Sequence, residues 1–125
     1  MTSIRLATLL GPALIAPSLL LADPAEVLDV EATSAGDTWR FSVTIAHADA
    51  GWDDYADGWR IEGADGTIYG ERPLAHPHVD EQPFTRSVSG VAIPDGVTEV
   101  MIRASTNIEG YAEDTFGPFP LSDDG

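Results

Sequence analysis

After residue 26 the chain consists of short apolar runs separated by clusters of Gly, Pro and Asp, and no apolar repeat at helical spacing lasts for three turns. An amphipathic helix requires apolar residues at spacings of three and four, whereas alternation at a spacing of two is typical of a half-buried strand. The clearest alternation places Trp39, Phe41, Val43 and Ile45 on one face and Arg40, Ser42, Thr44 and Ala46 on the other. The sequence therefore predicts an all-β chain.

Seven strands are expected, at residues 27–33, 39–46, 58–63, 67–74, 84–93, 97–107 and 115–121. The dipeptide Asp65-Gly66 predicts a hairpin between the third and fourth, because glycine takes positive φ without strain. In the fifth strand Val88 is out of phase with Val91, which predicts a bulge at Ser89-Gly90. Two prolines in the last strand predict an edge position. Seven short strands in a chain of this size favour a sandwich of two sheets.

Alternation also predicts which side chains face the core. In the first strand Leu28, Val30 and Ala32 share one face and are expected to be buried. His47 continues the buried register of the second strand beyond its last residue. We therefore expect a histidine at the boundary between the core and the following loop.

Residues 1–22 have the pattern of a secretory signal peptide. Arg5 precedes an uncharged apolar stretch that ends at Ala22, and Asp23 begins an acidic region. The apolar stretch contains two prolines and is shorter than the roughly 20 residues that a membrane-spanning helix needs. We therefore expect cleavage after Ala22, a single domain at 23–125, and a location in the periplasm or outside the cell.

The region after residue 22 is strongly acidic. It contains all 21 Asp and Glu residues but only five arginines and no lysine, so its formal charge is −16 (five minus 21). This charge disfavours binding to nucleic acid or, after cleavage of the signal, to anionic membranes. It favours a cation or a basic partner, unless the acid only keeps an exported monomer soluble in a salty medium.

Cysteine is absent from the chain. Disulfide bonds, thiolate metal sites and cysteine nucleophiles are therefore excluded. The apolar core must stabilise the fold without covalent cross-links.

The stretch SVSGVAIPDGVTEVMIRASTN, residues 87–107, resembles the fifth-to-sixth strand passage of fibronectin type III domains, where a Leu-x-Pro-Gly-Thr-x-Tyr turn leads into an alternating strand. Val100 stands where that family usually has tyrosine, the turn is longer, and Trp39 lies at the start of its strand. The resemblance implies a seven-stranded immunoglobulin-like sandwich and no particular function. The segment HPHVDEQPFTR, residues 76–86, is also similar to a stretch of uncharacterised secreted bacterial proteins, which implies no activity.

Chain direction alternates in such a sandwich, so the loops after the second, fourth and sixth strands are expected at the same end. These loops, residues 47–57, 75–83 and 108–114, contain all three histidines and many acids. The functional surface is therefore expected there.

The segment His76-Pro77-His78 is the strongest candidate for a site. Proline favours an extended backbone at the residue before it, so two imidazoles are presented at short spacing. Imidazole with carboxylate suits zinc, copper or nickel. The expected metal ligands are His76, His78, His47, Asp80 and Glu81. The alternative is structural: the loop histidines bond to neighbouring carbonyls or carboxylates, His47 ends a core strand, and Arg86 pairs with Glu81.

Three aromatic residues, Trp52, Tyr55 and Tyr111, are candidates for binding a sugar or a peptide, or else they cover the end of the core. Residues 53–58 resemble an oxygen-rich calcium loop. Tyr55 occupies a ligand position in that pattern, however, and Ala64 stands where a glutamate is required.

The chain has no Gly-x-Ser-x-Gly motif, no His-Glu-x-x-His motif and no phosphate-binding glycine loop. We therefore expect no enzymatic activity. The expected function is that of an exported binding module that holds a divalent transition metal, zinc or copper, through the His-Pro-His loop. The alternative is an adhesion or scaffold domain that recognises a protein or a glycan.

Overall fold

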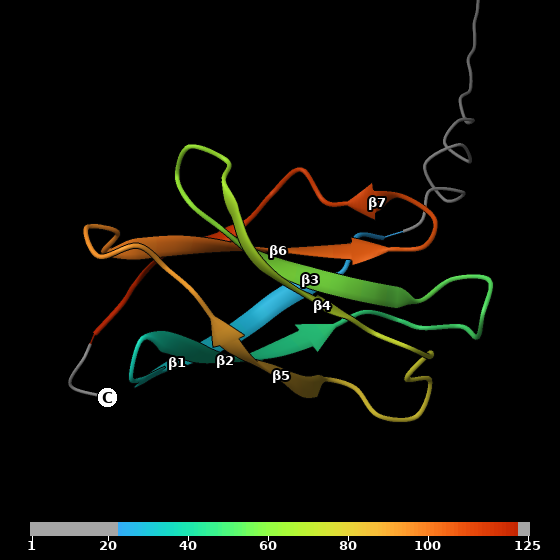
Figure 1. Cartoon of the computed structure of the whole chain (residues 1–125). Coiled ribbons are helices and arrows are strands. Elements are labelled where there is room, and N and C mark those ends of the chain that lie inside the picture. Colours follow the sequence, from blue (N-terminus) through green and yellow to red (C-terminus); the bar gives the residue numbers. More distant parts are fainter. Residues whose placement is uncertain (1–22, 123–125) are drawn as a thin grey trace, which may run out of the picture.

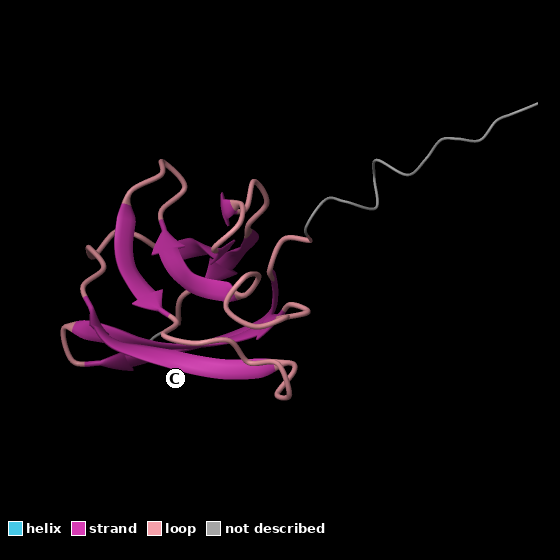
Figure 2. Cartoon of the chain, turned by 90° about the vertical axis from the view of Figure 1, so that its right-hand side faces the viewer, coloured by secondary structure: helices cyan, strands magenta, loops and turns pink. Residues whose placement is uncertain are grey.

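The computed structural model describes residues 23–122, and the expected signal peptide lies outside them. In this part the chain forms eight strands and no helix, so no helix there could span a membrane. A three-stranded antiparallel sheet has the order β1 (Glu26–Ala35), β2 (Thr38–Ala46), β5 (Phe84–Val91). Figures 1 and 2 show this sheet facing a second sheet, and the two sheets together form a two-layer sandwich.

The second sheet is also antiparallel and is built around β6 (Glu99–Thr106). On one side of β6 lies β3 (Ala56–Glu62), followed by β4 (Ile68–Pro73). On the other side, β7 (Gly110–Tyr111) pairs with the end of β6, and β8 (Phe116–Pro120) pairs with its beginning. The all-β prediction is thus confirmed, and β7 is an eighth strand that the sequence did not indicate, because two residues carry no periodicity.

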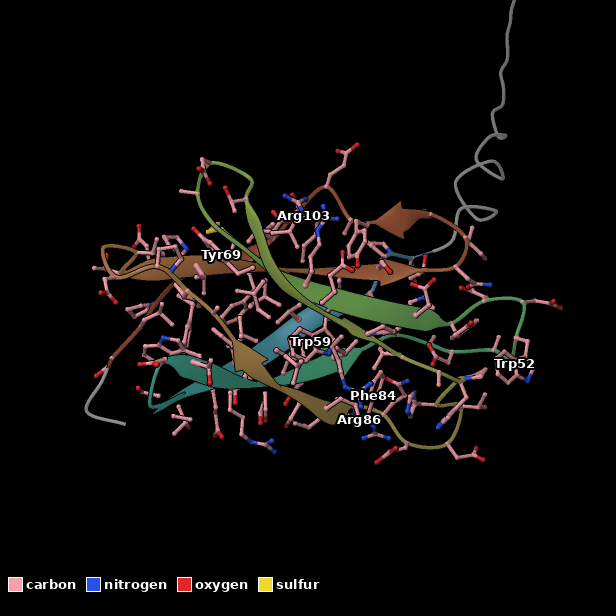
Figure 3. The ribbon with its side chains drawn as sticks, in the orientation of Figure 1. Trp52, Trp59, Tyr69, Phe84, Arg86 and Arg103 are labelled. Atoms are coloured by element: carbon pink, nitrogen blue, oxygen red, sulfur yellow. The ribbon has the colours of Figure 1, made fainter. Side chains whose placement is uncertain are left out.

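The core lies between the two sheets. From the three-stranded sheet it receives Phe41, Val43 and Ile45, each fully buried, as the alternation predicted. From the other sheet it receives Trp59, Ile61, Val100 and Ile102, which are also fully buried. Figure 3 shows Trp59 between the layers. Burying each such side chain contributes about 1.5–3 kcal/mol, and no disulfide supplements this contribution.

Two predicted irregularities are confirmed. The β3–β4 hairpin turns at Asp65-Gly66, where Gly66 has a φ of 89°. In β5 an extra residue near Gly90 separates Val88 from Val91 relative to their partners on β2. These turns and bulges depend on local residue chemistry, so the sequence reveals them.

The predicted face of Leu28 is wrong. A bulge between Val27 and Asp29 shifts the register of β1 against β2. Val27 therefore packs against the core while Leu28 is 45% exposed. The prediction extended the alternation backwards from Val30 through this bulge. The extra residue in the bulge exchanges the faces of Val27 and Leu28.

Candidate functional site

Three loops meet at one end of the sandwich: the β2–β3 loop, the β4–β5 loop and the β6–β7 turn. The backbone nitrogen of His78 donates to Asp49 Oδ2 at 2.8 Å, which joins the first two loops. The backbone nitrogen of Tyr55 donates to Asn107 Oδ1 at 2.8 Å, which joins the first and the third. We call this end the loop pole; it lies at the right of Figure 1 and faces the viewer in Figure 2. The predicted gathering of the three loops is confirmed.

The centre of the loop pole is Asp49, whose side chain is completely buried. Its Oδ1 accepts hydrogen bonds from His47 Nδ1 at 2.6 Å and from the backbone nitrogen of Ala56 at 3.0 Å. Its Oδ2 accepts the bond from His78. A buried carboxylate is stable only when such donors replace its lost hydration. The Asp49 carboxylate therefore holds the β2–β3 loop, the β4–β5 loop and the start of β3 together.

Gln82 adds a second connection between the same loops. Its Oε1 accepts from the backbone nitrogen of His47 at 3.0 Å, and its Nε2 donates to the backbone oxygen of His78 at 2.9 Å. One side chain thus bonds to the backbone of both histidines. Neither Asp49 nor Gln82 was among the candidates from sequence, and the only signal for Asp49 was its place two residues after a buried histidine.

His47 is 7% exposed and both of its ring nitrogens are engaged. Nδ1 contacts Asp49, and Nε2 lies 3.0 Å from the backbone oxygen of Asp23. Both partners carry acceptor oxygens. Neither nitrogen is free to bind a metal ion in this arrangement. His47 instead joins the buried Asp49 to the backbone of Asp23.

His78 occupies a different environment. Its ring is 5% exposed and stacks on Phe84, with centroids 4.0 Å apart and planes at 10°. His76, which is exposed, lies on the side chain of His78 with ring centroids 4.6 Å apart. Burial, followed by the charges of Arg86 and His76, lowers the pKa of His78 below 6.5. His78 is therefore neutral at pH 7, and neither of its ring nitrogens has a hydrogen-bond partner.

The two carboxylates predicted near these histidines have other surroundings. Glu81 is paired with Arg86 Nη2 at 3.1 Å, as in the structural alternative. Asp80 is exposed at the tip of its loop. Within residues 23–122 no group of three or more histidine, aspartate or glutamate side chains is arranged to hold a metal ion. The structure thus brings the rings of His76 and His78 together, whereas His47 and Glu81 are bonded to other groups.

The aromatic candidates fall into two separate places. Trp52 is 65% exposed and packs edge-on against Tyr55, with centroids 5.5 Å apart. Asn107 fixes this pair, because its Nδ2 donates to the backbone oxygen of Trp52 at 3.1 Å while its Oδ1 holds the Tyr55 amide. Tyr111 lies on β7 with its ring 3.8 Å from the Arg60 guanidinium. Figure 3 shows Trp52 at the outer end of the loop pole.

The acids of the calcium-like segment also have separate surroundings. Asp53 is exposed, and Asp54 Oδ1 lies 3.5 Å from His47 Nε2. Asp57 accepts a hydrogen bond from the Ser105 hydroxyl on β6. Their carboxylates thus have different neighbours in this structure.

A second charged cluster lies on the five-stranded sheet. Glu62 is 3% exposed and accepts two hydrogen bonds from Arg103, at 2.8 and 3.1 Å, and one from Arg60 at 2.6 Å. The bonds from Arg103 are the main cause that lowers the Glu62 pKa below 4.5, although burial opposes them. Arg103 also donates to the backbone oxygens of Ala112 and Glu113. The cluster therefore anchors the segment after β7 to the sheet.

No protein-family model and no solved structure matches the chain. It is similar to a protein of Halomicrobium mukohataei that is described as "Putative lipoprotein", with 43% identity over 88 residues. The match covers 70% of this chain and 43% of that relative. The chain thus spans less than half the length of the relative, and the activity of the whole relative does not transfer directly.

Proposed function

We propose that the chain is an exported, non-enzymatic binding module whose loop pole recognises a partner protein through Trp52. The observation that carries this proposal is the 65% exposure of Trp52 on a loop that hydrogen bonds hold in place. Tryptophan is enriched among the residues that dominate interface energies. A fixed loop loses little conformational entropy on binding. Asp49 and Asn107 supply that rigidity.

Two further observations support the wider proposal. The similarity to a protein described as a lipoprotein supports export to the cell envelope, and we propose the periplasm or the cell exterior as the location. Because the 125 residues contain no cysteine, a lipid linked to a cysteine thiol has no attachment point within them. The order β1-β2-β5 against β3-β6-β8 supports an immunoglobulin-like arrangement, in which the first, second and fifth strands share a sheet.

A photo-crosslinking amino acid in place of the exposed Asp53, next to an intact Trp52, should give a covalent adduct of one defined mass in cells of the native host. The same probe at Ile68, which is 46% exposed on β4, serves as the control and should give none. Wild-type protein without the probe, added in excess, should compete for the partner and suppress the adduct. Trp52→Ala without the probe should need at least a tenfold higher concentration for the same suppression. Identical adducts at both positions, or none at position 53, would contradict a protein partner at the loop pole. If the wild type then bound a glycan array and Trp52→Ala did not, the partner of the loop pole would be a glycan.

The loop histidines support a second candidate function, the binding of Zn(II) or Cu(II) by His76 and His78. The specific observation is that both ring nitrogens of the buried His78 lack hydrogen-bond partners, in an imidazole kept neutral by its surroundings. Neutral imidazole is the form that binds a metal. Asp80 or Glu81 is the proposed source of a carboxylate ligand.

Calorimetric titration with Zn(II) should show one stoichiometric site in the wild type. His76→Ala should abolish it, and so should His78→Phe, which keeps the stacking on Phe84. Asp95→Ala, an exposed change in another turn, is the control and should bind normally. Affinity should decline as the pH falls through about 6.5, because protons compete for imidazole. If His76→Ala binds zinc like the wild type, this candidate function is wrong.

A further inference from the structure

A groove of about 1160 Å³ runs along the side of the sandwich next to the loop pole. One wall is the beginning of the described chain, residues 23–27, with the end of β2 and residues 82–83 beside it. The other wall is the segment 109–116, which connects β6 to β8 through β7. Trp52 is not among the lining residues. The groove therefore adjoins the loop pole but does not include the side chain proposed above as its binding residue.

The groove combines apolar lining with an acidic rim. Ala25 is buried in its lining, and Val27 and Phe116 are half-buried there against the core. Five of the lining residues are acidic and exposed, namely Asp23, Glu26, Glu109, Glu113 and Asp114. No lysine or arginine is among the lining residues. An occupant that fits both parts needs positive charges and apolar groups together.

The arginines of the described chain do not neutralise this rim, because each is engaged elsewhere. Arg40 donates to Ser89, Arg72 to two backbone oxygens, and Arg86 to Glu81. Arg60 and Arg103 both bind Glu62. Arg103 interacts electrostatically with Asp114, but two hydrogen bonds hold its guanidinium on Glu62. Within residues 23–122, no arginine is therefore left to neutralise the acidic rim.

The size and spread of the groove identify the class of occupant. Small-molecule pockets measure roughly 300–1,000 Å³, and this open groove exceeds that range. The rim acids come from two separate segments of the chain, and among residues 23–122 no group of three or more acids or histidines is arranged to hold a metal ion. We propose that the groove binds an extended segment of a partner protein in which basic and apolar side chains alternate. Such a segment places its bases on the rim and its apolar groups on the half-buried lining.

The binding of a fluorescein-labelled eight-residue peptide of alternating arginine and leucine, followed by fluorescence polarisation in 50 mM salt, tests this proposal. The groove variant is Glu109→Gln/Glu113→Gln/Asp114→Asn. The control variant, Glu31→Gln/Asp37→Asn/Asp95→Asn, changes the net charge equally at exposed residues that do not line the groove. We expect the groove variant to raise Kd at least tenfold and the control variant to raise it less than twofold.

Three results would overturn the proposal. Equal weakening in the two variants would show attraction by the overall charge alone. Undiminished binding of a peptide with glycine in place of leucine would exclude a contribution from the apolar lining. No saturable binding of the first peptide would exclude the groove altogether. Trp52→Ala should leave peptide binding unchanged, so this proposal can fail or hold independently of the function proposed for the loop pole.

Discussion

Replacing Asp49 with alanine is expected to lower the free energy of unfolding by about 3–5 kcal/mol, because three buried donors lose their carboxylate acceptor. The substitution removes the acceptor of three hydrogen bonds, from His47 Nδ1 and from the backbone nitrogens of Ala56 and His78. All three donors are then left without a partner in a site that excludes water. A domain of this size is stable by roughly 5–15 kcal/mol in total, so the loss should be obvious in urea or guanidinium unfolding.

Two comparisons separate this effect from a general sensitivity of the loop. Asp53→Ala, four residues away and exposed, should change stability by no more than about 0.5 kcal/mol. Asp49→Asn keeps one acceptor oxygen and nearly the same volume, so it should cost less, about 1–3 kcal/mol. In Asp49→Asn the amide protons of Ala56 and His78 should exchange faster with solvent. A stability of Asp49→Ala within 1 kcal/mol of the wild type would show that the carboxylate does not organise the loop pole.

Replacing Glu62 with glutamine is expected to cost about 1.5–3 kcal/mol at pH 7, because the hydrogen bonds it loses involve charged partners on both sides. Arg60 and Arg103 would then face each other without the carboxylate between them. Glu99→Gln, on β6 but exposed, is the matched control and should be nearly neutral.

The same substitution has a predictable pH dependence. The Glu62 pKa is lower in the folded protein than its ordinary value of 4.5. Its stabilising effect is therefore complete above pH 4.5 and is lost as the pH falls through the lower, folded value. The difference in stability between wild type and Glu62→Gln should shrink between pH 7 and pH 3. A difference that stays constant over this range would show that the ionised carboxylate is not the source of the effect.

Glu62→Gln should also affect the groove. Arg103, which is hydrogen-bonded to Glu62, also donates to the backbone oxygens of Ala112 and Glu113. Hydrogen exchange at the Ala112 amide, which bonds to the backbone oxygen of Ala104 at 2.9 Å, should report any loosening of this wall.

Local patterns in the sequence predicted most of the strands and the meeting of the three loops. Phe41, Val43 and Ile45 alternate without interruption, and Asp65-Gly66 carries its own turn chemistry, so each could be read from neighbouring residues. The face of Leu28 could not, because a bulge at one residue reverses a period of two.

The organisation of the site was less predictable, because it depends on residues far apart in the sequence. Asp49 bonds to the backbone of His78, which is 29 positions further along the chain. Glu62 and Arg103 are separated by 41 positions, and neither shows a local motif. The sequence identified His76 and His78 as a pair of interest, with His47 as a third candidate. Only the fold shows that His47 is hydrogen-bonded at both ring nitrogens and His78 at neither.

The last strand determines how this molecule can meet its neighbours. Among the described strands β8 pairs with β6 alone, and Pro118 and Pro120 offer no N–H group along it. A foreign strand that tried to lengthen the sheet at this side would find an interrupted ladder of hydrogen bonds. Growth into fibrils by addition of strands is therefore disfavoured along this edge.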